Sequence, residues 1–465
     1  MSTILERLDL TPLTALHAFA ALLCAVGFGI DLMEISVGNA LSAVFSAPPY
    51  ALSPRPLAWL LSSVYVGAVI GAPLLGWAAD RSGLRRTLMV TLLWLGVTSS
   101  LAAAGSSPQW LTAFRFLSGV ALGAYPPLMI AYLTAIAPPR YRGVVILWVC
   151  GAAYLAPPVA VFMIRWLTPV QPLGVEGWRW PFAVAGIGAL AVGVAFGRVP
   201  ESARWLLSRG RDADAEAVCS RFARSRPLWG AGLRGALKMP NFAPGCSARA
   251  AAVDAGAPSV GRRDSTRVSA IDAGASHFYR RFAFVAALYF LSPWAVAAFP
   301  LLTGPILLAR GYNLTDTLLY IGLATFGPAV STLAVGPVVD RIERRVSLTL
   351  CCLLMLLAMV LFFTARGSVL LLISVVSFGV GVALCSAVMA MYGAELFPVV
   401  SRARATAVAW AGNRVASVLV PIVMLPLLHQ AGASAVAVVI CVVLIGTMVF
   451  VTLWGPGGAA ARAVG

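Results

Sequence analysis

Apolar residues occur in long blocks along the chain, and polar residues gather in the short segments between them. A helix needs about 20 mostly apolar residues to cross the hydrocarbon core of a bilayer, whereas barrel strands alternate apolar and polar residues. The stretch from Leu348 to Phe363 is apolar on every side, which favours helices. The pattern predicts an all-α membrane protein with twelve transmembrane helices. The predicted spans are residues 14–40, 58–79, 88–104, 109–137, 143–168, 180–198, 280–303, 316–338, 347–364, 369–393, 405–428 and 433–454.

The composition agrees with a bilayer environment. Of the 465 residues, 60% are hydrophobic and 11% are charged, whereas a soluble domain carries about 25% charged residues. The formal net charge of +17 would ordinarily suggest a nucleic-acid partner. Because the arginines lie between the apolar blocks rather than on one soluble module, we expect the lipid bilayer as a partner and no nucleic acid.

The arginines also predict the orientation in the membrane, because cytoplasmic connections are enriched in Lys and Arg. If the amino terminus is cytoplasmic, the short inner connections hold ten arginines and the outer ones hold five. We therefore expect a multi-pass protein of the cytoplasmic (inner) membrane with both termini in the cytoplasm. The first apolar block is too long for a signal-peptide core and is expected to remain as the first span.

An internal repeat relates the two parts of the chain. Asp80 and Arg81 recur 260 residues later as Asp340 and Arg341. The same offset relates Gly119 to Gly379, Tyr132 to Tyr392 and Arg142 to Arg402. One constant offset over separate segments indicates two parallel, pseudo-symmetric six-helix bundles related by an axis along the membrane normal. The predicted division is an amino-terminal bundle at 1–198, a basic cytoplasmic linker at 199–279 and a carboxyl-terminal bundle at 280–465.

The linker is rich in arginine and in small spacer residues. Its first part, Ala203 to Arg224, is predicted to form a short amphipathic helix on the membrane surface. The remainder, to about Ser276, is predicted to be a flexible segment. The arginines either attract anionic lipid headgroups or belong to an ordinary cytoplasmic connection, and the sequence leaves both readings open.

One segment strongly resembles the inner-loop signature of the major facilitator superfamily. It contains Gly76, Asp80, Arg81, Gly83, Arg85 and Arg86, and a partial copy in the second half contains Asp340, Arg341 and Arg345. The segment from Arg115 to Gly123 resembles the fourth-helix motif of the superfamily. Pro200 to Leu206, with Glu201 and Arg204, is similar to the motif after the sixth helix of sugar porters and metabolite:proton symporters. Glu395 to Pro398, with Arg402, resembles the end of their tenth helix.

The resemblance implies the major facilitator fold and transport by alternating access. In that scheme, charged residues of the inner loops tie helix ends together in the outward-open state and release them in the other state. Arg142 and Arg402 are then the expected partners of the carboxylates Glu201 and Glu395. The alternative is that these arginines only set the orientation. The family usually has a glutamate near the end of the fourth helix, where this chain has Ala135.

Ionisable groups inside membrane spans are costly, so each is a candidate functional residue. Asp31 and Glu34 lie three residues apart on one face of the first span. By resemblance, Asp31 matches an aspartate tied to proton coupling, and Arg115 matches an arginine that pairs with it. A dry site favours the protonated carboxyl and a nearby arginine favours the carboxylate, so alternating access would let Asp31 take up and release a proton. The alternative is a static ion pair. Glu34 is expected to line the path or to face water near the outer end.

The eleventh span carries Arg414 beside Asn413. Arg414 either binds an anionic group of the substrate or pairs with an acid. Tyr65, Tyr154 and Trp294 are candidate cavity-lining aromatics, although aromatic residues in membrane helices more often pack or anchor the helix at the interface.

The prediction about the substrate rests on the residues of the seventh span. Sugar porters have paired glutamines there, whereas Leu288 to Pro305 contains no glutamine or asparagine. Two arginines inside the membrane suit a small organic anion, so proton:organic-acid symport is the first interpretation, by resemblance to aromatic-acid and related metabolite symporters. The alternatives are a proton-driven exporter of a drug or metabolite, a sugar-type permease, and a sensor that kept the fold without transport. We expect no enzyme activity, no cofactor, no metal site, and function as a monomer.

Overall fold

The computed structural model describes Ile4, Arg7 and residues 11–105, 107–227, 265–331, 342–397 and 399–456. Within these ranges, the side chains of residues 140, 265–277, 394, 395 and 399–407 are not described. The predicted gate residues Asp340 and Arg341 therefore lie outside the described residues, as do the side chains of Glu395 and Arg402.

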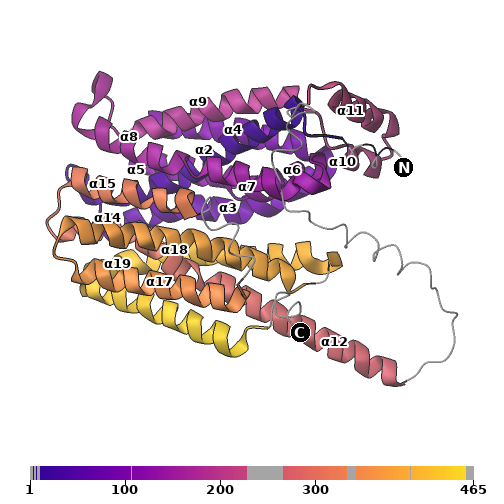
Figure 1. Cartoon of the computed structure of the whole chain (residues 1–465). Coiled ribbons are helices and arrows are strands. Elements are labelled where there is room, and N and C mark those ends of the chain that lie inside the picture. The colour runs from indigo at the N-terminus through magenta and orange to yellow at the C-terminus, as the bar shows by residue number, and fades with distance from the viewer. Residues whose placement is uncertain are drawn as a thin grey trace, which may run out of the picture.

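Two groups of long helices lie side by side along a common axis (Figure 1). The amino-terminal half consists of α2 (Ala15–Ser46), α3 (Pro54–Ser82), α4 (Leu84–Ala104), α5 (Pro108–Leu122), α6 (Tyr125–Ile136), α7 (Arg142–Ala153), α8 (Ala156–Val170) and α9 (Arg179–Ala195). The carboxyl-terminal half consists of α12 (Ser265–Leu291), α13 (Pro293–Val296), α14 (Ala298–Ala309), α15 (Leu314–Ala324), α17 (Arg344–Thr364), α18 (Ser368–Glu395) and α19 (Val399–Trp454). Two short helices, α10 (Ala203–Ser208) and α11 (Asp212–Arg224), follow the first half.

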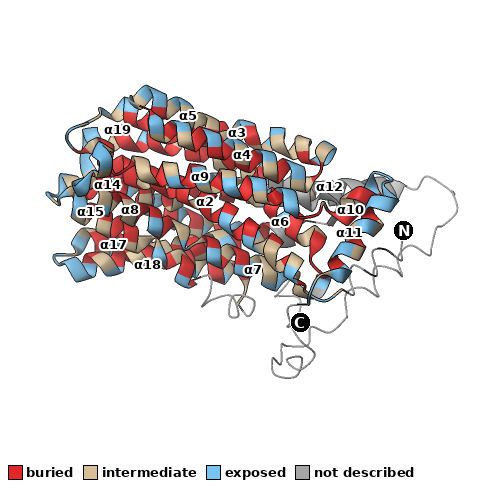
Figure 2. Ribbon diagram, turned by 90° about the horizontal axis from the view of Figure 1, so that it is seen from above, coloured by how far each residue is buried: buried red, intermediate tan, exposed pale blue. Residues whose placement is uncertain are grey.

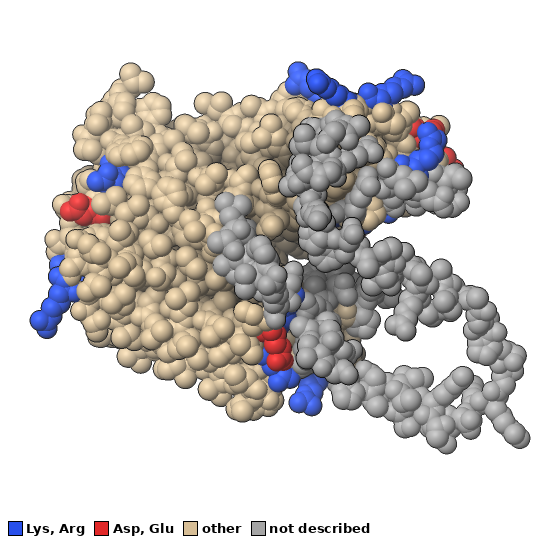
Figure 3. All heavy atoms as spheres, viewed as in Figure 1, with Lys and Arg blue, Asp and Glu red and all other residues tan. Residues whose placement is uncertain are grey.

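The bundle has two distinct ends. We call the end that carries α10 and α11, on the right in Figure 1, the α10 end. The opposite end, which carries the turn between α8 and α9, is called the far end. Buried residues run through the centre of the bundle from one end to the other (Figure 2), and charged side chains leave a broad uncharged belt on the face shown in Figure 3.

Ten helical stretches of the described chain are long and apolar enough to cross a membrane. The last, Val408–Trp454, contains the twelfth predicted span and all but the first three residues of the eleventh, and the backbone changes direction between them at Gly432, which has a φ of 80°. The eighth predicted span begins with α15 and continues beyond the described residues. Within the described residues, each predicted span therefore overlaps a helix.

Prolines interrupt three of the predicted spans. The fourth is divided between α5 and α6 before Pro126, the fifth between α7 and α8 before Pro157, and the seventh before Pro293. A proline has no backbone N–H, and its ring clashes with the preceding turn, so a helix cannot continue through it unbent. Such breaks persist inside a membrane because neighbouring helices satisfy the freed backbone groups.

The internal repeat is visible in the packing of the helices. A Cβ atom added to Gly119 of α5 would overlap the backbone oxygen of Val64 in α3, and one added to Gly379 of α18 would overlap that of Ala324 in α15. The two glycines and the two oxygens are each 260 residues apart. Small residues allow helix backbones to approach closely in membranes. The repeat predicted from the sequence is thus confirmed as a structural repeat.

Two buried tyrosines form equivalent hydrogen bonds in the two halves. The Tyr132 hydroxyl donates a hydrogen bond to the carbonyl of Pro200 (2.8 Å), and the Tyr392 hydroxyl donates one to the carbonyl of Pro456 (2.5 Å). Each proline follows the last helix of its half, so each tyrosine ties the fourth helix of a half to the end of the sixth.

Two details of the predicted linker are wrong. The predicted helix from Ala203 to Arg224 is divided into α10 and α11 by Gly210, which has a φ of 70°. The apolar side of α11 packs on protein, since the ring of Phe222 lies 4.3 Å from that of His17 at the start of α2. The apolar stretch of the seventh helix begins at Phe278, close to the predicted residue 280, but the helix itself extends back to Ser265, into the segment predicted to be flexible.

The two halves are joined at the far end by side-chain hydrogen bonds to backbone oxygens. Ser42 of α2 donates to Leu301 of α14 (2.6 Å), and Ser62 of α3 donates to Val418 of α19 (2.9 Å). A third bond runs from Arg165 of α8 to Thr315 of α15 (3.1 Å). All three donors lie in the parts of their helices that are nearer the far end.

Candidate functional site

A cavity of about 320 Å³ lies between the halves, where α2 and α3 face helices of the carboxyl-terminal half. Its lining is mainly apolar and includes Phe299 and Phe378, with a few polar groups among them. Tyr65, Asn413 and Arg414, which the sequence singled out, are among the lining residues. Concave sites with an apolar wall and a few placed polar groups are the usual form of small-molecule sites.

The structure places the other two predicted aromatics elsewhere. Tyr154 packs edge-on against Phe28, with ring centroids 6.5 Å apart, and Trp294 packs against the buried core. Neither is among the described residues that line the cavity. Two lining residues, Asn39 and Trp410, were missed by the sequence analysis. Asn39 is a polar residue inside a span, and Trp410 lies one helical turn before Arg414, so both signals were present in the sequence.

Arg414 offers a positive charge to the cavity. Its guanidinium carbon lies 4.8 Å from the centre of the Trp410 ring, a cation–π contact that holds the side chain in place. Its Nε is buried and makes no hydrogen bond within the described chain. Asn413 is engaged differently, because its side-chain nitrogen donates to Tyr289 O (3.2 Å) and to Ser292 Oγ (3.0 Å). The hydrogen-bond donors available to a ligand in this part of the cavity therefore belong mainly to Arg414.

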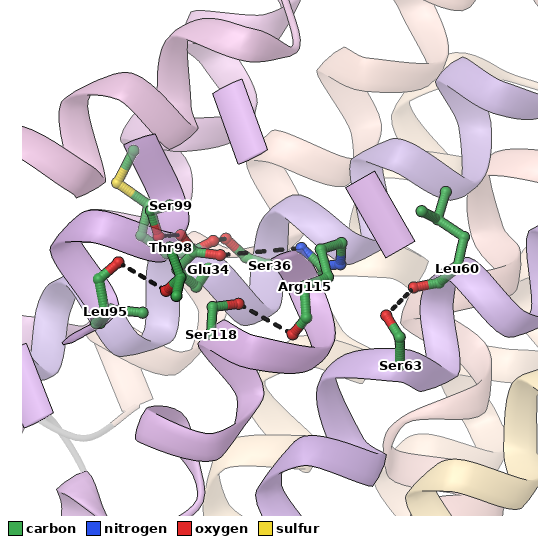
Figure 4. A network of polar contacts seen from close by, with 10 residues as sticks. Glu34, Ser36, Leu60, Ser63, Leu95, Thr98, Ser99, Arg115 and Ser118 are labelled. Carbon is green, nitrogen blue, oxygen red and sulfur yellow. Dashed lines mark hydrogen bonds and ion pairs between the residues drawn. The ribbon is translucent and has the colours of Figure 1, made fainter. Parts of the chain in front are cut away.

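Arg115 pairs with Glu34, not with Asp31 as the sequence predicted. Arg115 Nη1 lies 3.9 Å from Glu34 Oε2, and each side chain is 1% exposed. Ser99 donates a hydrogen bond to the other Glu34 oxygen (Figure 4). The relative displacement of α2 and α5 along their axes explains why Arg115 pairs with Glu34 rather than with Asp31. A Cβ atom added to Gly38 would lie 3.2 Å from Arg115 Nη2, so the guanidinium sits beyond Glu34, one turn too far from Asp31.

Glu34 is therefore buried in a polar cluster of the amino-terminal half, and the prediction that it lines the path or faces water is wrong. Asp31 is also 1% exposed, and its Oδ1 has no hydrogen-bond partner in the described chain. Asp31 forms no ion pair within the described chain, and the arginine that acts on it at longer range is Arg414, from the other half. Two acids and two arginines thus lie within the membrane spans, where uncompensated charge is very unfavourable.

The inner-loop motif is organised around Gly83 and Glu201. Gly83 has a φ of 98°, and it ends α3 and begins α4. Glu201 Oε1 accepts hydrogen bonds from the backbone N–H groups of Arg85 (3.1 Å) and Ser202 (2.9 Å). Arg85 Nη1 donates to the carbonyl of Val199 (3.1 Å). The motif therefore joins the turn between α3 and α4 to the segment that follows α9.

The remaining residues of the motif lie at the surface of the α10 end. The Asp80 carbonyl accepts hydrogen bonds from Trp205 (3.2 Å) and Arg209, while the Asp80 side chain is exposed. Arg81 stacks over Trp77 at 4.1 Å, and Arg86 is exposed. In the second copy of the motif, Arg345 Nε lies 3.8 Å from Glu343 Oε1.

The described contacts do not test the predicted ion pairs of the gate arginines. Arg142 Nε donates to the carbonyl of Ala137 (3.0 Å), and Arg204 lies in α10. The pairing of Arg142 with Glu201 stays a prediction, and so does that of Arg402 with Glu395.

Replacing Gly83 with alanine is expected to destabilise the protein by about 1–3 kcal/mol, because only glycine readily adopts this backbone conformation. In addition, a Cβ atom there would overlap the Glu201 carboxylate and break its bonds to the backbone. Thermal unfolding in detergent measures the effect. Gly76→Ala is the matched control, since a Cβ atom at Gly76 meets nothing within 4 Å. A Gly83→Ala protein that unfolds at the parental temperature would contradict this account of the motif.

The described side-chain hydrogen bonds between the two halves all lie toward the far end of the bundle. On α2, the cavity is lined by Leu32, Ile35 and Asn39.

Comparisons with known proteins place the chain in a family. The family model described as "Sugar (and other) transporter" matches residues 18–456. The niacin transporter NiaP of Acinetobacter baylyi is 26% identical over 48% of this chain and 49% of its own length. The metabolite transport protein YgcS of Escherichia coli is 28% identical over 50% of this chain and 51% of its own length. The chain thus matches about half the length of these curated relatives.

Solved structures show the same fold. The partially occluded, inward-open xylose transporter XylE from E. coli superimposes with a TM-score of 0.69 at 20% identity, over 95% of this chain and 97% of that one. A D-xylose-proton symporter gives a TM-score of 0.68 at 19% identity, over 96% and 98%. The predicted twelve-helix fold is confirmed by these matches. From the family match and this fold together, the chain belongs to the sugar (and other) transporter family of the major facilitator superfamily.

Proposed function

We propose that this protein is a secondary active transporter that moves a small organic anion together with protons across the cytoplasmic membrane by alternating access. One observation carries the proposal: the cavity between the two halves is lined by Arg414, and two acids and a second arginine, Asp31, Glu34 and Arg115, are buried within the neighbouring spans. Buried charge in a membrane protein is retained for a function, because it is costly to the fold.

The polar groups of the cavity favour an anion over a sugar. Arg414 presents a buried donor without a hydrogen-bond partner in the described chain, and a guanidinium matches the geometry of a carboxylate. The side-chain N–H groups of Asn413 are already used by Tyr289 and Ser292. The apolar walls, with Phe299 and Phe378, suit the carbon skeleton of an organic acid.

Asp31 is the group that we assign to proton coupling. It is buried and lacks a hydrogen-bond partner for Oδ1 in the described chain, and the arginine that acts on it belongs to the opposite half. A movement of the halves therefore changes its surroundings, and a carboxyl group whose surroundings change between states takes up a proton in one and releases it in the other.

The orientation follows from the arginine bias, with the α10 end in the cytoplasm. The structure is then inward-facing, because its halves are joined by hydrogen bonds at the far end.

A cysteine at Leu22 is expected to react with a membrane-impermeant maleimide added from the cytoplasmic side. Leu22 is 58% exposed and lies on α2 between the cavity-lining residues and the α10 end. Ser42→Cys is the matched control on the same helix, because Ser42 is fully buried in the far-end contact. Labelling is compared with that of the parent chain, which carries the native cysteines. Equal protection of both variants in inside-out vesicles would contradict an inward-facing cleft.

A sugar is the second candidate substrate. The cavity lining contains hydroxyl groups such as Thr303 and Ser386. A galactose-proton symporter of E. coli is 30% identical over 45% of this chain. The hydroxyl lining and this likeness are the observations that favour the alternative.

Uptake into liposomes that contain the purified protein distinguishes the two candidates. Nicotinate, the anion of niacin, serves as the carboxylate probe because of the relative named for it, and D-galactose serves as the sugar probe. With an acidic exterior, we expect concentrative uptake of nicotinate and none of galactose. Galactose uptake alone would reject the anion assignment, and uptake of either probe without any effect of the pH gradient would reject proton coupling.

A further inference from the structure

Two polar side chains of the amino-terminal half line the cavity, and one of them has the chemistry to select among organic anions. We propose that Asn39 binds a second, uncharged polar atom of the substrate while Arg414 binds its carboxylate. The substrate is then a monocarboxylate that also carries a ring nitrogen, a hydroxyl or an amide group, rather than a dicarboxylate or a purely hydrocarbon acid. This inference rests on the proposed function and specifies the substrate class of that site.

The amino-terminal half contributes four of the described lining residues, Leu32, Ile35, Asn39 and Tyr65. The first two are apolar. Neither the Asn39 amide nor the Tyr65 hydroxyl makes a hydrogen bond within the described chain. An asparagine amide both donates and accepts hydrogen bonds, so Asn39 can pair with a ring nitrogen as well as with a hydroxyl group. A ligand bound to Arg414 of the other half therefore finds its polar contacts with this half at these two side chains.

The hydroxyl groups on the opposite side of the cavity are already engaged. Each donates to a backbone carbonyl three or four residues earlier in the chain, over 2.6–3.3 Å. These side chains belong to Ser292, Thr303, Thr325, Ser386 and Ser417. Their hydrogens satisfy the chain itself. The Asn39 amide differs from them, because both its N–H groups and its oxygen remain available to a ligand.

Asn39 is held where α2 contacts α14. Ser42 Oγ donates both to the carbonyl of Asn39 (2.6 Å) and to that of Leu301 (2.6 Å). One turn farther along α2, the backbones are close, since a Cβ atom added to Gly304 would lie 2.7 Å from the Cβ atom of Ala43. This contact fixes the backbone of Asn39 against the opposite half. A side chain that projects from a rigid element can discriminate between similar ligands.

Arg414 lies at a different contact, between α3 and α19. Ser62 of α3 donates to the carbonyl of Val418 of α19 (2.9 Å). Because α3 and α19 run in opposite directions, Tyr65 and Arg414 each lie about one helical turn from this bond, on the same side of it. Asn39 and Arg414 therefore approach the cavity from two different helix pairs, and they are suited to two different parts of one ligand.

The charge of the lining limits the charge of the substrate. Apart from Tyr65, Arg414 is the one ionisable side chain among the described lining residues. A second carboxylate would have no opposite charge beside it in a largely apolar wall, which is costly. An uncharged polar atom is much less costly to bury, and the Asn39 amide satisfies it.

Binding of nicotinate and benzoate to the purified full chain tests the role of Asn39. The two anions share a ring and a carboxylate, and benzoate lacks the ring nitrogen. In calorimetry at neutral pH, the parent is expected to bind nicotinate about tenfold more tightly, the effect of one hydrogen bond between uncharged groups. Asn39→Leu is expected to lose this preference and to bind both anions as the parent binds benzoate. Tyr65→Phe is the matched control and is expected to keep the preference.

A second pair of probes tests the parent protein alone, so its result does not depend on the folding of any variant. 3-Hydroxybenzoate and 3-methylbenzoate have nearly the same size and the same charge. We expect the hydroxyl compound to bind about tenfold more tightly, because the Asn39 oxygen can accept a hydrogen bond from it.

Three results would overturn the inference. They are equal affinity of the parent for the two members of either pair, a preference for nicotinate that persists in Asn39→Leu, and a loss of that preference in Tyr65→Phe, which would assign the contact to Tyr65. Failure of the proposed function has a different signature, since the parent would then bind none of the four carboxylates.

Discussion

Replacing Arg115 with methionine is expected to remove most of the folded protein. The substitution leaves Glu34 buried without its arginine, and breaking a buried ion pair from one side costs about 3–5 kcal/mol. Hydrophobic volume is largely retained, so the loss comes from charge rather than from a cavity. The fraction of protein that elutes as a monodisperse species from a size-exclusion column in detergent, and its thermal unfolding temperature, measure the effect.

The double variant Glu34→Gln/Arg115→Met provides the control. It removes both charges, and replacing a buried pair by neutral groups is often close to neutral for stability. We expect it to recover most of the folded fraction that the single variant loses. If Arg115→Met alone unfolds at the parental temperature, the pair seen at 3.9 Å does not contribute to the fold, and the assignment of Arg115 to Glu34 is wrong.

Replacing Arg414 with glutamine is expected to leave folding nearly intact and to weaken anion uptake. Removing one partner of a desolvated charge pair costs about 3 kcal/mol of binding free energy, which raises the half-saturation concentration for nicotinate on the order of a hundredfold. Folding is affected less than at Arg115, because Arg414 lines a cavity, is less buried than Arg115 and forms no ion pair within the described chain. Initial uptake rates over a range of nicotinate concentrations measure the effect.

Arg414→Lys is the matched control for that experiment. It keeps the charge but loses the planar contact with Trp410 and the two-pronged geometry for a carboxylate. An intermediate half-saturation concentration is expected. An Arg414→Gln protein with the parental half-saturation concentration would show that the anion binds elsewhere.

The spans and the repeat were predictable because they depend on local physical rules. Apolar length marks a membrane helix whatever its neighbours are. Gly119 and Gly379 recur at one offset because each sits at the close contact of a helix pair with the opposing backbone. The start of α12 was not predictable in this way, since its first residues are polar and carry no signal of apolar length.

The pairing of the charges was only partly predictable. The sequence identified Asp31, Glu34, Arg115 and Arg414 as candidates, because charges inside spans are rare and costly. The sequence alone does not determine which acid pairs with which arginine. Asp31 and Glu34 lie on the same face of α2, and the choice depends on how far α5 is displaced along α2. That displacement is visible only in three dimensions, through the position of Arg115 beside Gly38.

The central claim is that Asp31 couples the movement of protons to that of an anion, and one measurement tests it most directly. Liposomes that contain either the parent protein or Asp31→Asn are given an acidic exterior, and the steady-state ratio of internal to external nicotinate is measured. The account predicts a ratio well above one for the parent and a ratio of one for Asp31→Asn, with exchange of labelled for unlabelled nicotinate still occurring in the variant. Full pH-driven accumulation of nicotinate by Asp31→Asn would contradict the account.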